Sequence, residues 1–310
     1  MGVFVFLPLV LPLTAWPIAR LAEQHLHPRT ATRLLTGVAA VMAVCSTVCL
    51  GLVMVVGTAQ LPGNPLPDGW SDPEVREAVP YDEVVGKAAI PALCLVVVAC
   101  GRNLWRHGRV RHRAHRALAG LPGTEVAVLP DAIPYAYALP GGGRGRVVVT
   151  TALLDCLEPA ERRALFAHER AHLAARHHRF LLTVQLAGHT NAFLRPLRTA
   201  VSYTAERWAD EEAARVVGSR RVVAGAIGKA ALVSRGTPVP TLAGFAAPGP
   251  VPRRVAALLG PAPAARCWPS VFTSVGLATW GAAAGTAVSA MSSANSAVTM
   301  FFILHAATPL

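Results

Sequence analysis

The chain has 310 residues, of which 53% are hydrophobic and 15% are charged, and its mean hydropathy is +0.43. These values favour one domain combined with membrane spans over two soluble domains. The formal net charge is +12, but the basic segment 102–116 contains a single aromatic residue, Trp105, and no recognisable DNA-binding module, so we expect no nucleic-acid partner. The six cysteines include no C-x-x-C pair, which argues against a thiolate metal site.

Four apolar stretches predict membrane spans. Residues 1–19 contain three prolines and lack both a basic start and an A-x-A-like cleavage site, so we expect a retained, kinked span rather than a signal peptide. Residues 34–57 are long enough to cross a bilayer core, which takes about 20 residues. Residues 84–100 carry only one charge, near their outer end, and residues 269–310 carry none.

The basic residues predict the orientation in the membrane. Arginines lie in the first loop, at positions 20, 29 and 33, and again in the segment 102–116 after the third span, whereas the loop between the second and third spans is acidic. By the positive-inside rule, the basic segments face the cytoplasm and anionic lipid headgroups, and the acidic loop lies outside. We therefore expect a multi-pass protein of the cell membrane with an external N-terminus.

A folded cytoplasmic region is predicted between the third and fourth spans. It begins with strand-like segments at residues 125–129, 135–139 and 146–151, separated by turns. The glycine run 141–143 precedes a strand and not a helix, which argues against a phosphate-binding loop. The expected fold is a mainly α membrane protein with an α+β domain, divided into a membrane region at 1–116, the domain at 117–265 and a final helix at 266–310.

The next predicted helix carries the motif H-E-x-x-H at His168, Glu169 and His172. Pro159 suits a first helical position. Because positions i and i+4 share one face of a helix, the two imidazoles can bind one metal ion, with Glu169 close enough to act as a general base. The five-residue motif also arises by chance, and the alternative is a helix with two surface histidines.

A third ligand is predicted on a helix further along the chain. An apolar segment at 180–194 is too short for a clear span, and it is followed by a helix at 199–217 that ends at Gly218. On that helix Glu206 and Asp210 share a face. Such a pair is commonly a solvated surface pattern, but after H-E-x-x-H it suits a His-His-Glu zinc site. Asp210 would then accept a hydrogen bond from a ligand histidine and fix its tautomer.

His178 is a rival third ligand, because a longer variant of the motif, H-E-x-x-H-x-x-G-x-x-H, has a histidine there. That variant turns the chain at a glycine, whereas this sequence has Ala175. Since alanine favours a continuous helix, we expect His178 to be carried away from the metal. His177 and His178 are assigned instead to the basic end of the helix.

The succession of segments 135–140, 147–154 and 157–161 ahead of H-E-x-x-H resembles the gluzincin membrane peptidases. These include HtpX, the CAAX prenyl endopeptidases and the BlaR/MecR receptors. Pro196 ahead of the Glu206-x-x-x-Asp210 helix, the segment 254–258, and the order of three spans, zinc domain and final span are most similar to the BlaR/MecR-type integral membrane zinc metallopeptidases.

The resemblance implies Zn²⁺ as cofactor, with His168, His172 and Glu206 as ligands, Glu169 as general base and Asp210 as the orienting carboxylate. It also suggests that the strand at 146–151 offers its edge to an extended substrate. BlaR/MecR receptors carry a penicillin-binding sensor domain after the last span. The sequence ends at Leu310 without one, so we expect no direct β-lactam sensing.

The predicted function is a membrane-embedded zinc endopeptidase that cleaves a repressor or a membrane protein at the cytoplasmic membrane face. Tyr203, His189 and Arg254 are unranked candidates for stabilising the oxyanion. The expected partners are a protein or peptide substrate, the lipid bilayer and a regulatory protein contacting the acidic loop. Two alternatives are a proteolytically silent metal-binding scaffold or signalling subunit, and a membrane-tethered nucleic-acid binder that uses the basic segment.

Overall fold

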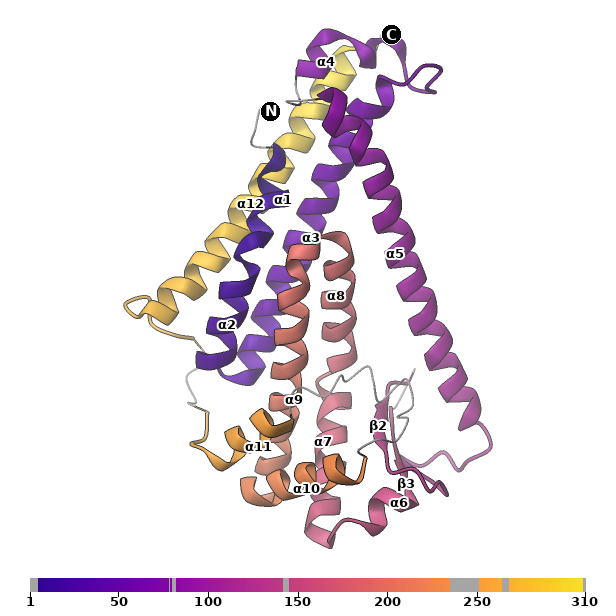
Figure 1. The fold of residues 1–310 in the computed structure, drawn as a ribbon, viewed down its shortest axis with the longest axis vertical. Helices are drawn as coiled ribbons and strands as arrows, with labels where there is room; N and C mark the ends of the chain where they lie inside the picture. The colour runs from indigo at the N-terminus through magenta and orange to yellow at the C-terminus, as the bar shows by residue number, and fades with distance from the viewer. Residues whose placement is uncertain are drawn as a thin grey trace.

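The computed structural model describes residues 5–77, 79, 82–141, 145–234, 251–263 and 268–308. The molecule is a long bundle of helices that carries a small sheet and several short helices at one end (Figure 1). Three helices are long and apolar enough to cross a membrane: α3 (Pro28–Ala59), α5 (Asp82–Ala117) and α12 (Ser274–Ala306). They agree with three of the four predicted spans.

The N-terminal run does not form a fourth helix of spanning length. It consists of α1 (Leu7–Val10), the 3₁₀ helix η2 (Leu11–Thr14) and α2 (Ala15–His25). Proline lies near the start of both of the first two helices, and because proline has no backbone N–H to donate, each one ends the preceding run of helical hydrogen bonds. The segment packs along α3 and α12. Its crossing of the membrane as a kinked span stays a prediction.

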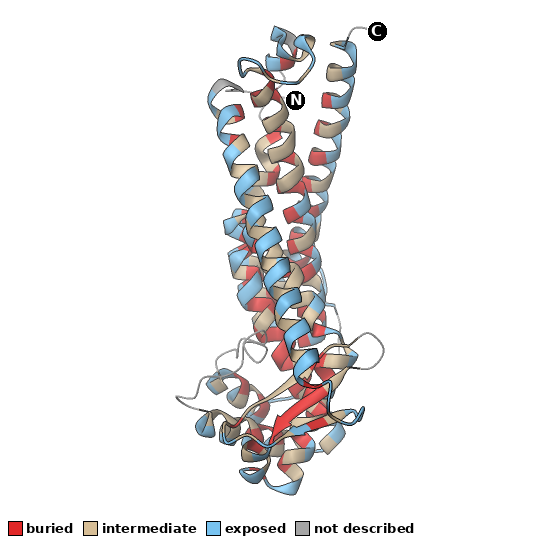
Figure 2. Ribbon diagram, turned by 90° about the vertical axis from the view of Figure 1, so that its right-hand side faces the viewer, coloured by how far each residue is buried: buried red, intermediate tan, exposed pale blue. Residues whose placement is uncertain are grey.

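The acidic loop and the start of α5 lie at the far end of the bundle from the sheet (Figure 1). The loop contains the 3₁₀ helix η3 (Asp68–Ser71) and α4 (Pro73–Glu77). From there α5 runs the length of the molecule, and its outward face is exposed along most of that length (Figure 2). Leu95, Val97 and Val98 are among its exposed apolar side chains, as expected for a helix whose solvent is lipid.

The helices α3 and α5 cross at two glycines, Gly57 and Gly86, whose backbones are in direct contact. A side chain at either position would collide with the backbone of the other helix. Small residues at such a crossing let two membrane helices pack by backbone contact. The pair therefore fixes where α5 leaves α3 on its way to the sheet.

We expect Gly57→Ala to destabilise the folded protein by about 1–3 kcal/mol, because the added methyl group overpacks the crossing. The matched control is Gly51→Ala, one and a half turns earlier in α3, where an added Cβ meets no atom within 4 Å. Thermal unfolding of both variants in detergent measures the difference. Equal unfolding temperatures would contradict a tight crossing.

The sheet contains β1 (Val126–Leu129), β2 (Ala136–Leu139) and β3 (Arg146–Thr150) in the order β1-β3-β2. The strand β3 pairs in parallel with β1 and antiparallel with β2. Both edges of β3 are therefore occupied, and the expectation that this strand offers an edge to a substrate is wrong. Its branched apolar side chains make it the buried central strand, with Val147, Val148 and Val149 fully buried.

The helices that follow the sheet are α6 (Thr151–Asp155), α7 (Pro159–Ala174), α8 (His177–Thr190), the 3₁₀ helix η4 (Ala192–Leu194), α9 (Arg195–Val217), α10 (Arg220–Val233) and α11 (Val251–Leu259). Of these, α8, η4 and the first half of α9 form a hairpin that lies beside α3 (Figure 1). We call it the α8–α9 hairpin. The remaining helices stay close to the sheet.

The α8–α9 hairpin shares one apolar core with the membrane helices. Val184, Leu197 and Val201 are fully buried in a cluster with side chains of α2 and α3. At the tip of the hairpin, the Asn191 side chain donates to Ser46 Oγ at 3.2 Å, half-way along α3. A domain boundary at residue 117 thus separates helices that pack together. The domain boundaries given by the sequence stay a prediction.

Candidate metal centre

The helix α7 begins where the sequence predicts. Pro159 occupies its first turn, and Glu158 and Glu161 form a capping box in which each side chain accepts from the backbone N–H of the other. Three turns later the helix carries His168, Glu169 and His172. Glu169 and His172 are buried, so the two-surface-histidine alternative does not describe this helix.

The end of α7 differs from the prediction. The helix stops at Ala174, Arg176 adopts a left-handed conformation with φ 55°, and α8 begins at His177. The preference of Ala175 for continued helix is overruled by tertiary packing, because the break at Arg176 lets the apolar face of α8 pack against α3 and α9. His177 and His178 therefore start a new helix instead of ending the old one.

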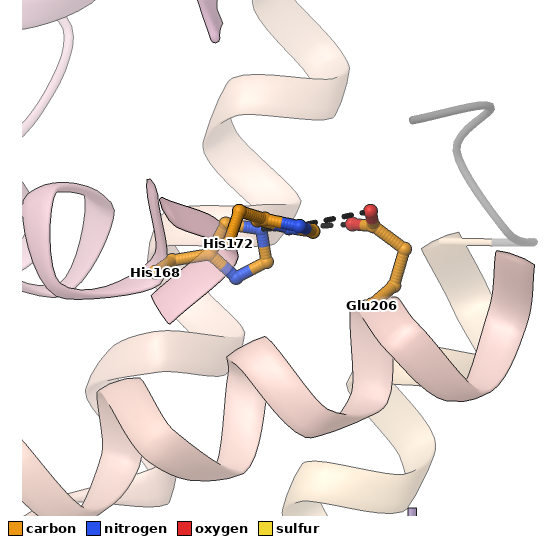
Figure 3. Close-up of side chains that lie close together, drawn as sticks. All are labelled: His168, His172 and Glu206. Atoms are coloured by element: carbon orange, nitrogen blue, oxygen red, sulfur yellow. Dashed lines mark hydrogen bonds and ion pairs between the residues drawn. The ribbon is translucent and has the colours of Figure 1, made fainter. Parts of the chain in front are cut away.

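The helix α9 brings the third predicted ligand to the two histidines. Gly218 ends this helix in a left-handed conformation, as predicted. Glu206 extends from α9 toward both imidazoles of α7 (Figure 3). Its carboxylate oxygens lie 3.5 Å from His168 Nε2 and 3.4 Å from His172 Nε2, and the two nitrogens are 3.1 Å apart.

These distances fit a metal ion. Ligand atoms about 2.0–2.2 Å from one tetrahedral ion are about 3.3–3.6 Å from each other. The observed nitrogen–nitrogen distance and the shortest distance from each nitrogen to a Glu206 oxygen are close to this range, although the two nitrogens approach different oxygens. Two imidazoles and one carboxylate are also a usual donor set for catalytic zinc, with the fourth position left open. His168, His172 and Glu206 therefore form a potential metal site, and the structure brings together all three residues that the sequence indicated.

Asp210 and Arg254 surround the metal site. His168 Nδ1 lies 3.1 Å from Asp210 Oδ1, which directs Nε2 of the same ring toward the metal position. Arg254, from α11, donates to both oxygens of Asp210, at 2.6 and 2.8 Å, and also lies 2.9 Å from Glu206. The structure thus gives Asp210 the orienting position that was expected, and adds a buried arginine that neutralises two carboxylates.

His177 is a site residue that the sequence analysis missed. It is buried, and its Nδ1 lies 2.9 Å from Nδ1 of His172, so Nε2 of His172 is left to face the metal position. On its other side the ring packs against Trp208 of α9, whose indole also contacts Arg29 and Arg33 of α3. The sequence does show a second pair of histidines directly after the motif. Because a continuous helix would carry that pair away from the metal, the pair was not assigned to the site.

Burial and the neighbouring charges shift the pKa values of the site. Burial alone would lower the pKa of His168, but Asp210 and Glu206 outweigh it and raise that pKa to about 10. For Glu206, burial opposes ionisation, yet Arg254 and His172 hold its pKa below the ordinary value. At His172, in contrast to His168, the neighbouring carboxylates do not outweigh burial, and burial lowers the pKa of His172 to about 4.

Metal binding at pH 8 is expected to release about one proton, because His168 is protonated there and must lose its proton to become a ligand. The apparent dissociation constant for Zn²⁺ should then fall about tenfold for each pH unit between pH 8 and 10. Calorimetric titration in buffers of different ionisation enthalpy counts the protons. A metal affinity that does not change with pH would contradict the raised pKa of His168.

Glu169 is held against the edge of the sheet. Its carboxylate accepts a hydrogen bond from the backbone N–H of Ala138 in β2, and burial raises its pKa to about 7. A carboxylate with a pKa near the working pH is suited to accept and return protons. The structure therefore places the predicted base beside the metal site and beside the edge strand β2.

A cavity of about 490 Å³ opens onto Glu169 and the three potential ligands. Of the three oxyanion candidates, Arg254 lines this cavity. Tyr203 is buried under Arg253, and His189 lies at the other end of α8, 3.1 Å from Asn103 of α5. His178 also lines the cavity but is not part of the metal cluster.

Comparison with known proteins finds a family model that matches part of the chain. Residues 101–188 match the model of Peptidase family M48. The M48 match includes His168, Glu169 and His172 and ends before Glu206. The three apolar helices of the described residues are long enough to cross a membrane.

A curated relative supports the M48 match. The chain is 43% identical over 64 residues to Protease HtpX homolog 2 of Methanosarcina mazei. The aligned part is 19% of this chain and 21% of that relative, so the chain covers about a fifth of the relative's length. No solved structure matches the chain. The closer resemblance to the BlaR/MecR type stays a prediction.

Proposed function

We propose that the protein is a zinc-dependent endopeptidase of the membrane that hydrolyses peptide bonds at its cytoplasmic face. The observation that carries the proposal is the arrangement of His168, His172 and Glu206 at the spacing of tetrahedral zinc ligands, with Glu169 beside them. The M48 match supports a peptidase reaction, and the arginines in the first loop and on α5 support the cytoplasmic orientation.

The reaction needs a Lewis acid and a base. Zinc bound by the three ligands would activate a water molecule and polarise the scissile carbonyl. Glu169 accepts the proton of the attacking water and returns it to the amine that leaves. The Ala138 N–H holds the Glu169 carboxylate in place during both transfers, and the buried walls of the cavity strengthen these interactions by excluding bulk water.

The residues around the ligands keep them in position. Asp210 orients His168, and His177 orients His172. Arg254 keeps Asp210 and Glu206 ionised, since their negative charges would otherwise repel each other in a buried site. We assign these three residues to positioning, because none of them needs to touch the reacting atoms.

The edge strand β2 offers the substrate a backbone to pair with. Tyr135, Ala136, Tyr137 and Ala138 line the cavity. Within the described sheet β2 is an edge strand that pairs with β3, and its Ala138 N–H already donates to Glu169. A peptide added as a further strand would lie in extended form beside Glu169. The substrate is then an unfolded segment of a protein, such as a repressor or a membrane protein undergoing regulatory proteolysis.

Two arrangements support a BlaR/MecR type of peptidase. The chain has two long apolar helices before the sheet and one after α11, with the N-terminal run as a further span in our proposal. In addition, the segment 254–258 forms the helix that delivers Arg254 to the site. A regulatory partner on the acidic loop completes this proposal.

Zinc content and proteolysis, measured in parallel on the purified full chain, test the function. We expect one bound zinc and cleavage of an unfolded protein such as casein by the wild type. His172→Ala and Glu206→Ala should each lose the zinc and the activity. Zinc bound at this site without turnover of any unfolded protein or peptide would favour the silent scaffold instead.

A further inference from the structure

The cavity extends to both sides of the metal site, along β2. At the start of the strand, Ser234 of α10 donates to the carbonyl oxygen of Pro134 at 3.1 Å. At its end, Arg111 and His115 of α5 contact the carbonyl oxygen of Pro140 at 3.3 and 3.0 Å. Glu169 meets the strand between these points, at Ala138. The strand edge therefore leads from α10, past the catalytic centre, to α5.

The α10 end of the cavity is apolar. The side chains that line it come from α6, the α6–α7 connection, the first part of α7 and α10, and they are apolar; Ser234 directly after α10 and Tyr135 at the start of β2 add hydroxyl groups. The apolar side chains include Leu153, Leu157, Leu165, Val223, Ile227 and Ala230. Burial of a large apolar side chain of the substrate here would favour binding.

The α5 end of the cavity is basic. Arg111 and His107 of α5 and His178 of α8 line it. Burial, with the nearby charges of Arg111, Arg179 and Arg176, lowers the pKa of His178 to about 4, so this ring is a neutral hydrogen-bond donor and Arg111 carries the positive charge. The Arg111 Nε–H is buried and donates to no acceptor within the part of the chain that the structure describes.

The cavity lining beside Arg111 includes no carboxylate within the described part of the chain. Among the described residues that line the cavity, the acidic ones are Glu169 and Glu206, and both belong to the catalytic centre. A guanidinium with an unused N–H, beside histidine donors, is matched by a carboxylate of the substrate.

We propose, on the basis of the proposed function, that the cavity selects peptides with a large apolar side chain on one side of the scissile bond and an acidic group on the other. The strand sets the spacing. From Ala138 to Pro140 an extended chain advances by about 7 Å, at about 3.4 Å per residue. The acidic group therefore lies within two or three residues of the bond that is cut.

Cleavage of a peptide library derived from a whole proteome tests the selection. The full chain in detergent, loaded with zinc, is incubated with the library, and the cut sites are read by mass spectrometry. We expect Asp and Glu to be enriched roughly fivefold on one side of the cut bond, and Leu, Ile, Phe and Met on the other side.

Charge reversal at the basic end supplies the decisive comparison. Arg111→Glu should replace the enrichment of Asp and Glu by one of Lys and Arg, and Arg111→Gln should remove it without reversal. The matched control is Arg113→Glu on the same helix, which is exposed and does not line the cavity, and its cut sites should equal those of the wild type. Ala230→Phe should shift the apolar preference toward small side chains.

Each other outcome overturns the inference. Cleavage with no acidic preference, or with a preference that Arg111→Glu leaves unchanged, would show that the basic end does not read the substrate, while the endopeptidase function would stand. Loss of the preference in phosphatidylglycerol vesicles but not in phosphatidylcholine vesicles would assign Arg111 to a lipid headgroup. Absence of any cleavage would overturn the proposed function together with the selection.

Discussion

Glu169→Gln is expected to lower the rate of peptide cleavage by about 10²–10⁴-fold, which is the usual contribution of a positioned general base. The amide has nearly the shape of the carboxylate but cannot accept the proton of the attacking water. The bound zinc should remain, because His168, His172 and Glu206 are untouched. Single-turnover cleavage of a fluorogenic peptide and metal analysis of the same sample measure the two effects.

The matched control for this substitution is Glu125→Gln. Glu125 is exposed, lies outside the cavity and pairs with Arg170 on the surface, so the variant should keep both zinc and full activity. If Glu169→Gln retained more than about a tenth of the wild-type rate, far above what loss of a general base allows, another residue would have to serve as the base. Loss of zinc from Glu169→Gln would instead assign this residue to the metal.

Arg254→Met is expected to destabilise the metal-free protein by about 3–5 kcal/mol, as is typical when one partner of a buried ion pair is removed. The arginine is the cation nearest to both Asp210 and Glu206, and without it His168 alone is left to balance two buried carboxylates. The loss should be smaller with zinc bound, since the ion supplies positive charge at the same place. Thermal unfolding in detergent, with and without zinc, separates the two values.

The neighbouring residue provides the comparison. Arg253 lies on the same helix and pairs with Glu23 at 2.9 Å, but its side chain is 47% exposed. Arg253→Met should therefore destabilise the protein less than Arg254→Met, although it removes the cation beside a Glu23 side chain that is 8% exposed, and it should not respond to zinc. If the two substitutions lowered the stability equally, the buried network around Asp210 would contribute no more to the free energy of unfolding than the Arg253–Glu23 pair does.

Local signals explain why parts of the structure could be predicted from the sequence. The start of α7 at Pro159 and the end of α9 at Gly218 depend on a few adjacent residues, and both were found. The face shared by His168 and His172 follows from helical geometry alone. Glu206 could be proposed because the two histidines needed one carboxylate to complete a usual donor set for zinc. The helix α9 carries such a carboxylate, on the same face as Asp210.

The features that were missed depend on tertiary contacts. The helix break at Arg176 follows from the burial of α8 against α3, and no residue near the break predicts it. Without that break, His177 could not be placed behind His172. The central position of β3 depends on which strands pair, and the bond between Arg254 and Asp210 joins residues 44 positions apart. Such long-range contacts are set by the whole fold and not by local preference.

The contact of Asn191 with Ser46, and the core around it, mean that the catalytic region is not an autonomous unit. A fragment that begins at residue 117 would lack α3 and the surrounding lipid, which cover Leu194, Leu197 and Val201 in the full chain. These three apolar side chains would then be exposed to water. Expression of such a fragment would give aggregates. For the same reason, a tilt of α3 within the bilayer would be transmitted through α9 to the carboxylate of Glu206.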